Sequence, residues 1–333
     1  MYPNTPLVNL YEFYYRAFGS DVDFDPSRQP KFDDVARIRT KNTTNLLCLE
    51  SGNWGICPTH WQYAQFPTEY RYKLSVIHDG IDTSLVTPNS NTKIKLASGV
   101  ELGRDTEVVT YVARNFEPYR GFPSFMRAVT EICRCGPNCH ILIVGADGVS
   151  YGAKLAKGDS WRKRLLAEAP IDPRRVHFLG TLSYANYVQV LQLSSVHVYL
   201  TIPFVLSWSM LEAMSAECLV VGSDTAPVRE AIEDGKNGLL VDFFSPSAIA
   251  DRVDEVLDHP DQMAKIRKQA RKTIVSRYEL SKCMPRQLAI LERLAAGRTP
   301  KPPAARATKS RKTTGKKTTV RATRRKTKSR KSK

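Results

Sequence analysis

The sequence lacks the patterns that would place it in a membrane or in a secreted class. No apolar run approaches the roughly 18 residues that a membrane-spanning helix needs. The first residues, MYPNTPLVNLYEFYY, have neither the basic region nor the apolar core of a secretion signal. Seven cysteines, an odd number in a chain without such a signal, favour reduced thiols. These absences predict a cytoplasmic protein with no transmembrane segment.

Paired metal-ligand spacing is also missing. Cys133, Cys135, Cys139 and His140 lie close together and are residue types that bind zinc. They do not follow the C-x2-C form, and the chain has no second cluster of this kind, so we expect a helix-to-strand turn and no metal site. Neither a helix-turn-helix nor a zinc-finger pattern is present, which leaves little support for sequence-specific DNA binding.

Acidic residues are absent from the C-terminal end. The chain has a net charge of +17, but residues 298–333 hold 16 of its 50 Lys and Arg residues. The remaining 34 basic residues stand against 33 acidic ones, so the first 297 residues carry a charge of only +1. We expect residues 297–333, which also lack aromatics, to be disordered. This tail either keeps the chain soluble or contacts polyanions through their phosphates, without base reading.

One stretch in the second half organises the rest of the chain. Residues 196–200 read as a buried strand, and a loop over 201–206 leads to Ser207, a good helix N-cap. A second strand over 218–221 is followed by a helix that opens near Pro227. Because loops after parallel strands line the ligand crevice, this stretch predicts an anion site at a helix N-terminus.

The same alternation of strand and helix begins at Glu107 and continues to residue 296, which predicts a doubly wound α/β sheet. Residues 83–105 read as a polar linker. Residues 1–31 read as an irregular aromatic segment that packs on another part of the molecule. Further along the chain we expect a helix after Pro58 and a strand over residues 74–78.

Three motifs resemble the retaining GT-B glycosyltransferases of family 4. Leu211-Glu212-Ala213-Met214 matches the run that carries the family's second Glu. Residues 112–121, VARNFEPYRG, resemble its Gly-Arg…Lys-Gly phosphate motif, and residues 78–82, HDGID, resemble its domain crossover. Eight positions before Glu212, where the family has a Glu that contacts the donor sugar, this chain has Phe204, and Leu206 and Trp208 replace small residues between the two.

The resemblance implies a site for a nucleoside-diphosphate sugar, the donor substrate, with no metal or other cofactor. Arg114 and Arg120 would stabilise the diphosphate as it leaves, as catalytic cations. Ser207, with the N–H groups of Leu206 and Ser207, would bind phosphate, and Glu212 would hold the ribose. The loop at the nucleobase comprises Gly180, Thr181 and Leu182. Each of these residues also has a plain structural explanation. Arg114 and Arg120 fit solvated arginines, and Ser207 fits an N-cap without a ligand. Glu212 fits an exposed helix acid, and residues 180–182 fit a turn at the end of a strand.

These observations predict a GT-B-like α/β protein with one complete Rossmann-like domain and part of a second. We expect a partial acceptor-side domain over residues 1–78, the donor domain over 79–296 and the basic tail over 297–333. The predicted function is transfer of a sugar, hexosyl by resemblance, to the hydroxyl of an unknown glycan or lipid, with retention. Phe204 and the short N-terminal part favour an alternative, a catalytically impaired nucleotide-binding or scaffold protein with a polyanion-binding tail.

Overall fold

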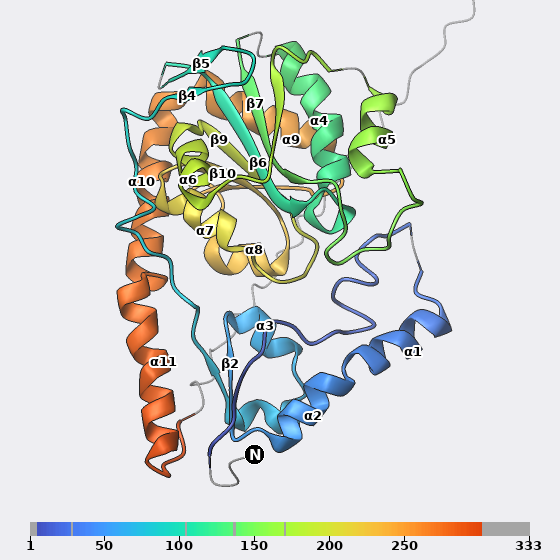
Figure 1. Ribbon diagram of the computed structural model, residues 1–333, viewed down its shortest axis with the longest axis vertical. Coiled ribbons are helices and arrows are strands. Elements are labelled where there is room, and N and C mark those ends of the chain that lie inside the picture. Colours follow the sequence, from blue (N-terminus) through green and yellow to red (C-terminus); the bar gives the residue numbers. More distant parts are fainter. Residues whose placement is uncertain (1–4, 28, 104, 136–137, 170, 302–333) are drawn as a thin grey trace, which may run out of the picture. The chain divides into compact units, whose positions relative to one another are not determined.

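The structure, a computed structural model, describes residues 5–27, 29–103, 105–135, 138–169 and 171–301. Within these residues the strands form a six-stranded parallel sheet, a three-stranded parallel sheet and a two-stranded antiparallel ribbon (Figure 1). The doubly wound α/β fold with a partial second parallel domain is thereby confirmed. The predicted disorder and polyanion contacts of the tail concern residues that lie, from 302 onward, outside the described part, and the predicted domain boundaries stay predictions.

Every neighbouring pair in the six-stranded sheet is parallel, in the order β11-β10-β9-β6-β7-β8. The chain builds outward from β6 in one direction and then returns to add β9 on its other side. This is the strand order of a dinucleotide-binding fold, with its topological switch point between β6 and β9. The strands are β6 (Val108–Asn115), β7 (His140–Ala146), β8 (Val176–Gly180), β9 (Val196–Tyr199), β10 (Leu219–Ser223) and β11 (Leu239–Val241).

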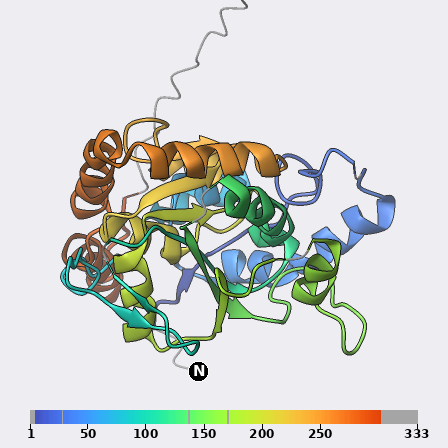
Figure 2. The same ribbon diagram turned by 90° about the horizontal axis from the view of Figure 1, so that it is seen from above.

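Helices cover both faces of this sheet (Figures 1 and 2). Side chains alternate between the two faces along each strand, so Val221 and Val220 point to opposite faces of the sheet and pack in different core clusters. On the first face lie α4 (Phe122–Cys135), α5 (Trp161–Glu168) and α9 (Pro246–Asp258). On the second face lie α6 (Tyr184–Leu193), α7 (Trp208–Ser215), α8 (Ala226–Ala231) and α10 (Pro260–Arg277).

The three-stranded sheet has the order β1-β2-β3 and a core of its own. The core residues on one face are Tyr11, Leu49, Cys57, Phe66 and Leu74. Trp54, Ile56 and Ile77 pack with Cys283 and Ile290 of the last helix, so this helix returns to the N-terminal part. The elements are β1 (Val8–Leu10), α1 (Phe32–Lys41), α2 (Thr43–Ser51), β2 (Trp54–Cys57), α3 (His60–Gln65), η1 (Thr68–Lys73), β3 (Leu74–Val76) and α11 (Leu280–Ala295).

Two short pairings were not expected from the sequence. Strand β1 lies in the segment that we expected to be irregular, and it exists because it pairs with β2, whose paired residues lie 46 positions further along the chain (Val8 with Trp54, for example). The expected polar linker contains the ribbon of β4 (Ile94–Lys95) and β5 (Glu101–Leu102), and Leu96 and Leu102 there are buried against the sheet. Strands of two or three residues carry too little periodicity to be recognised.

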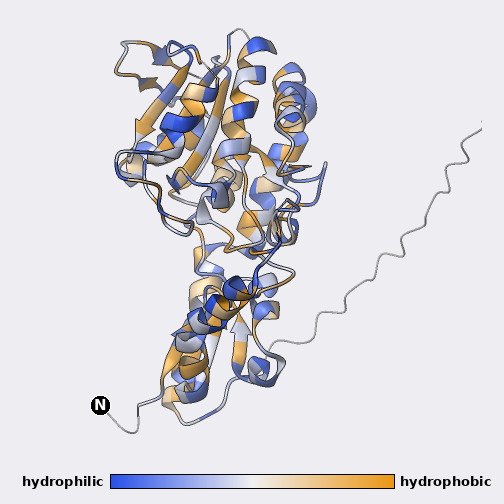
Figure 3. Ribbon diagram, turned by 90° about the vertical axis from the view of Figure 1, so that its right-hand side faces the viewer, coloured by the Kyte–Doolittle hydropathy of each residue, from blue (hydrophilic) through white to orange (hydrophobic). Residues whose placement is uncertain are grey.

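Hydrophobic residues concentrate in the strands of the six-stranded sheet, whereas the helices present mixed surfaces (Figure 3). Strands that are buried on both faces read as nearly continuous apolar runs, which is why the sequence predicted them well. Among the described residues, no helix combines the length and the apolarity needed to cross a membrane.

Candidate active site

The switch point brings the loops after β6 and β9 together. The first loop contains η2 (Pro118–Arg120) and then Gly121, whose φ of +64° lies in the left-handed region. A Cβ on Gly121 would lie 2.4 Å from Cβ of Leu200, so only glycine allows this close approach. In a doubly wound sheet the ligand crevice opens at this point, outside the carboxyl ends of the strands.

Arg120 is 9% exposed and joins the two loops. Its Nη1 donates to the Tyr199 hydroxyl at 3.2 Å, to the Thr201 hydroxyl at 3.0 Å and to the Val205 carbonyl at 2.9 Å. The other guanidinium nitrogens of Arg120 make no hydrogen bond with a described residue. One nitrogen therefore fixes the side chain, and the remaining N–H groups are available to an anionic ligand.

Tyr199 links Arg120 to the start of α7. Its hydroxyl also accepts a hydrogen bond from the backbone N–H of Ser207 at 2.8 Å. Burial raises the pKa of Tyr199, and the nearby Arg120 opposes the change, so the hydroxyl stays neutral. The Ser207 N–H, expected at a phosphate, is engaged here, whereas the N–H of Leu206 makes no hydrogen bond with a described residue. Ser207 is the N-cap as predicted, since its hydroxyl accepts from the N–H of Ser209 at 3.3 Å.

Glu212 lies one turn into α7 and is 6% exposed. Its two carboxylate oxygens accept hydrogen bonds from the hydroxyls of Tyr184 and Tyr187, each at 2.7 Å. Burial, together with this carboxylate, raises the pKa of both tyrosines. The alternative of an exposed helix acid therefore does not hold. Each oxygen keeps a further lone pair that can accept a ligand hydroxyl, and Tyr184, which is half exposed, leaves this end open to solvent.

Other candidate residues stand apart from this network. Arg114 is exposed on β6 and makes no hydrogen bond or ion pair with another described residue. Gly180, the last residue of the edge strand β8, and Thr181, which follows it, are exposed, and Leu182 packs partly against the sheet. Gly180 has a φ of +67°, as a turn requires. The structure thus joins Arg120, on the loop after β6, to the loop–helix unit that carries Ser207 and Glu212, and no hydrogen bond between described residues joins the other candidates to it.

Glu117 was missed in the sequence, although it holds the loop after β7. Its buried carboxylate accepts hydrogen bonds from the N–H groups of Ser150, Tyr151 and Gly152 at 3.2, 3.1 and 2.9 Å. Tyr151 is thereby placed with its ring centroid 5.4 Å from Cζ of Arg120. An acid directly before η2 gives no local signal of this role, because its partners lie more than 30 residues further along the chain.

The position where the family has a sugar-contacting Glu is filled by an aromatic cluster. Phe204 is 2% exposed, and its ring centroid lies 4.4 Å from that of Phe13, 4.8 Å from Tyr151 and 5.4 Å from Tyr119. Phe13 belongs to the N-terminal aromatic segment, so the expectation that this segment packs on another part of the molecule is confirmed. The ring of Phe204 offers no hydrogen-bond acceptor to a sugar.

Three further contacts tie the N-terminal part to the loops of the larger sheet. Half-buried Glu230 on α8 accepts hydrogen bonds from the N–H groups of His60 and Trp61, at 2.8 and 2.7 Å, at the start of α3. Ser20 donates its hydroxyl hydrogen bond to the Pro203 carbonyl at 3.3 Å, and the Tyr119 hydroxyl donates to Asp21 at 3.0 Å. These residues carry no local sequence signal, because each acts on a distant segment.

The cysteine and histidine residues form no metal site in the described part of the chain, where no group of three or more His, Cys, Asp or Glu side chains could hold an ion. The side chain of Cys135 lies outside that part. His197 is a core residue: its Nδ1 lies 2.9 Å from the Thr110 hydroxyl, and burial lowers its pKa to about 3.

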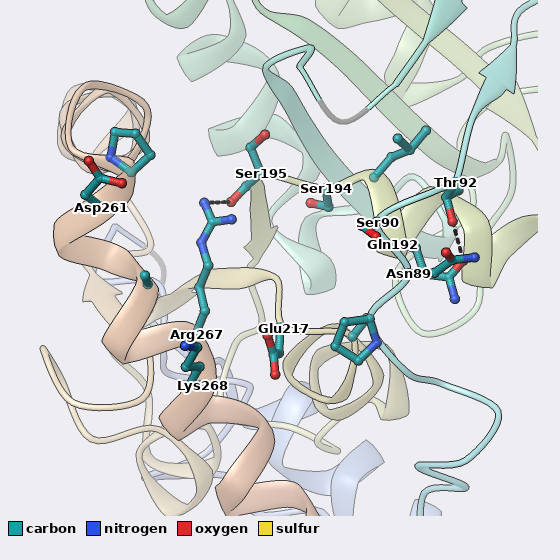
Figure 4. Close-up of a pocket in the computed structure, with 15 residues that line it drawn as sticks. Asn89, Ser90, Thr92, Gln192, Ser194, Ser195, Glu217, Asp261, Arg267 and Lys268 are labelled. Carbon is teal, nitrogen blue, oxygen red and sulfur yellow. Dashed lines mark hydrogen bonds between the residues drawn. The ribbon is translucent and has the colours of Figure 1, made fainter.

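A polar cavity of about 620 Å³ lies at the opposite edge of the larger sheet (Figure 4). Two residues that line it lie at the amino ends of strands: Ser195 directly precedes β9, and Glu217 comes two residues before the start of β10. Arg267 donates from Nη2 to the Ser195 carbonyl at 3.0 Å. The cavity is therefore separate from the carboxyl-end crevice in which Arg120 lies.

Comparison with known proteins places this geometry in a class. The chain resembles the structure of Anabaena HepE in complex with UDP-glucose, with a TM-score of 0.66 and 19% identity over 87% of this chain and 72% of that one. It also resembles sucrose-phosphate synthase from Thermosynechococcus elongatus, with a TM-score of 0.67 and 17% identity over 87% of this chain and 68% of that one. The fold is that of the GT-B glycosyltransferases.

Family models make the assignment specific. The family described as glycosyl transferases group 1 matches residues 96–273, more than half of the chain, and the glycosyl transferase family 4 group matches residues 1–86. The chain belongs to the group 1 glycosyl transferases, as the sequence motifs indicated.

Curated relatives match this chain over only part of their own length. A D-inositol 3-phosphate glycosyltransferase of Mycolicibacterium smegmatis is 28% identical over 188 residues, which is 56% of this chain and 41% of the relative. An alpha-D-kanosaminyltransferase of Streptomyces kanamyceticus is 26% identical over 218 residues, 66% of this chain and 53% of the relative. The chain thus spans about half the length of the curated relatives that it matches.

Proposed function

We propose that the protein transfers a sugar from a nucleoside-diphosphate donor to an acceptor hydroxyl. The observation that carries this proposal is the network of Arg120, Tyr199 and Ser207 at the topological switch point, with Glu212 one turn further along α7. Family membership and the neighbouring fold with bound UDP-glucose support it.

Breaking the bond between sugar and phosphate pushes negative charge onto the leaving diphosphate. Arg120 would stabilise that charge, because it is fixed by three hydrogen bonds and needs little reorganisation when the charge develops. The first turn of α7 adds backbone N–H groups and the positive end of a helix dipole. Glu212 would accept hydrogen bonds from the ribose hydroxyls, and exposed Arg114 would approach the phosphates from the end of β6.

Several finer properties are part of the proposal and rest on the family resemblance. These are retention of configuration, a hexose as the transferred sugar, and a glycan or lipid as acceptor. We also propose that no metal ion is required, since fixed guanidinium and N–H groups supply the charge stabilisation that a cation gives elsewhere. The cytoplasmic location and the polyanion contact of the tail stay predictions from the sequence.

One observation favours a second function, nucleotide binding without transfer. Phe204 removes the acidic group expected at the sugar and packs against Phe13 of the N-terminal segment. A protein of this kind would hold a nucleotide through Arg120 and Glu212 and serve as a sensor or scaffold.

Titration calorimetry with UDP, GDP and ADP and with their glucose and mannose conjugates separates these functions. We expect one nucleoside diphosphate to bind, and its sugar conjugate to be consumed when the chain is incubated with it. Binding without consumption in water or with added glycan and lipid acceptors would favour the second function. Failure to bind any nucleoside diphosphate would contradict both.

A further inference from the structure

A cavity of about 330 Å³ lies next to the Arg120 network, within the range of about 300–1,000 Å³ typical of ligand pockets. Its walls come from the N-terminal part and from the loops after β6 and β7. They include three tyrosine rings and one buried acid, namely Tyr15, Tyr119, Tyr151 and Asp21. Tyr151 lines the cavity, and its ring centroid lies 5.4 Å from Cζ of Arg120, so one aromatic ring separates the cavity from the guanidinium proposed to bind the diphosphate.

Asp21 is the polar group of this cavity that lacks a full set of partners. It is 9% exposed, and its Oδ2 accepts a hydrogen bond from the Tyr119 hydroxyl at 3.0 Å. Its Oδ1 is buried and has no hydrogen-bond partner among the described residues. A buried carboxylate oxygen without a partner is costly, and a protein keeps such a group where a ligand satisfies it.

The chain holds Asp21 beside the residue that departs from the family pattern. The Ser20 hydroxyl donates to the carbonyl of Pro203, which directly precedes Phe204. Tyr119, which donates to Asp21, packs edge-on against the ring of Phe204, with 5.4 Å between centroids. A carboxylate is thus absent from the loop after β9 but present in the same neighbourhood, supplied by the N-terminal segment.

We propose that Asp21 binds hydroxyl groups of the donor's sugar ring, and that Tyr15, Tyr119 and Tyr151 form the walls of this sugar subsite. An ionised carboxylate is a strong acceptor for sugar hydroxyls, and aromatic rings cover the apolar faces of the sugar. The proposal deepens the function given above and rests on it. The sugar rather than the acceptor is assigned here because the Tyr151 ring borders both the cavity and the guanidinium of Arg120.

The test compares Asp21→Asn with the wild-type chain by calorimetry, using the nucleoside diphosphate that binds best among UDP, GDP and ADP, and its hexose conjugate. Asparagine keeps an oxygen for Tyr119 but removes the charge. We expect the conjugate to bind about tenfold or more weakly, the loss expected when a charge-assisted hydrogen bond is removed. The affinity of the bare diphosphate should change less than about twofold.

Asp23→Asn is the matched control. Asp23 accepts hydrogen bonds from the N–H groups of Gly19 and Ser20 and so shapes the same loop without lining the cavity. It should leave both affinities unchanged. If Asp21→Asn does not fold, Tyr119→Phe replaces it, because it removes the hydroxyl that positions Asp21 and should weaken only the conjugate, by a few-fold.

Three results would overturn the sugar assignment. Asp21→Asn could weaken the conjugate and the bare diphosphate equally, or change neither affinity. Alternatively, Asp23→Asn could weaken the conjugate as much as Asp21→Asn does. An unchanged donor affinity with a raised KM for the acceptor would place Asp21 in the acceptor site and also overturn it. In each of these cases the wild-type chain still binds a nucleoside diphosphate, and the proposed function stands. If the wild-type chain binds none, the proposed function fails and this inference fails with it.

Discussion

The two ends of the candidate site are built in different ways. At the end proposed to bind the nucleotide, Tyr199 links Arg120, on the loop after β6, to Ser207 at the start of α7. Tyr184 and Tyr187 donate hydrogen bonds to Glu212, one turn further along α7. At the end proposed to bind the sugar, Phe204 packs on Phe13, and a buried acid, Asp21, comes from the N-terminal segment.

The comparison shows that the proposed nucleotide end is formed by loops and helices of the larger sheet. The proposed sugar end, in contrast, depends on how the N-terminal segment packs against the loops of that sheet. Changes at the nucleotide end should therefore affect donor binding first. Changes at the sugar end should affect the free energy of unfolding and the additional affinity that the sugar gives to the donor. They should leave the affinity for the bare nucleoside diphosphate nearly constant.

The largest effect on stability is expected from Phe204→Ala. Removing this buried ring leaves a cavity among aromatic neighbours and should lower the free energy of unfolding by about 3–5 kcal/mol. The ring centroid of Phe204 also lies 5.9 Å from Cζ of Arg120, but three hydrogen bonds still fix this guanidinium, so affinity for the bare nucleoside diphosphate should stay within about twofold. Denaturant unfolding and calorimetry measure the two quantities.

Phe18→Ala is the control, since this phenylalanine of the same segment is 63% exposed and its loss should cost less than about 0.5 kcal/mol. If a folded Phe204→Ala chain no longer binds the diphosphate, the two ends are not independent.

Arg120→Ala should have the largest effect on donor turnover. Loss of one fixed donor to a developing charge costs on the order of 10²–10³ in rate. The variant also leaves the buried hydroxyl of Thr201 without its guanidinium donor, so it should be less stable. Initial rates of donor consumption at saturating donor, with a thermal melt alongside, measure both.

Arg114→Ala removes the same charge from an exposed position. We expect an unchanged melting temperature and a loss of about tenfold in donor affinity. Near-normal turnover in Arg120→Ala would contradict the role assigned to the nucleotide end.

Glu212→Gln tests whether the nucleotide end holds a ribose. The wild-type chain should bind the nucleoside diphosphate about tenfold more tightly than its 2′,3′-dideoxy form, because charge-assisted hydrogen bonds to the hydroxyls are lost in the latter. In Glu212→Gln this difference should shrink to about twofold. Tyr184→Phe, which keeps the carboxylate, should retain most of the difference, and an undiminished difference in Glu212→Gln would argue against ribose contact.

The smallest effect is expected from Glu230→Gln, which weakens the tie between α8 and the start of α3. Its carboxylate acts as a helix cap from another part of the chain, so the loss should be about 1 kcal/mol in the free energy of unfolding. Glu233→Gln is the control, because that acid makes only an exposed ion pair with Lys236 and should change stability hardly at all. If Glu230→Gln and Glu233→Gln change the free energy of unfolding equally, the hydrogen bonds between Glu230 and the start of α3 do not contribute to stability.

Much of the larger sheet could be predicted from the sequence. Strands buried on both faces are short apolar runs. Ser183 and Ser207 are N-cap residue types, and the structure has them as the N-caps of α6 and α7. The family motifs then located Arg120 and Glu212. Strand β1 and the β4–β5 ribbon could not be predicted, because two or three residues have no measurable period and gain their structure only from a partner strand.

By itself, the sequence determined the doubly wound sheet and its helix starts, because these depend on periodicity and capping within a few residues. Arg120 and Glu212 were singled out by their place in motifs that resemble those of family 4. Only the tertiary structure decided that Tyr199 joins Arg120 to α7, that Glu117 holds the loop after β7, and that Asp21 lies beside Phe204. These contacts join groups far apart in the chain, so their partners are set by how the elements pack rather than by local pattern.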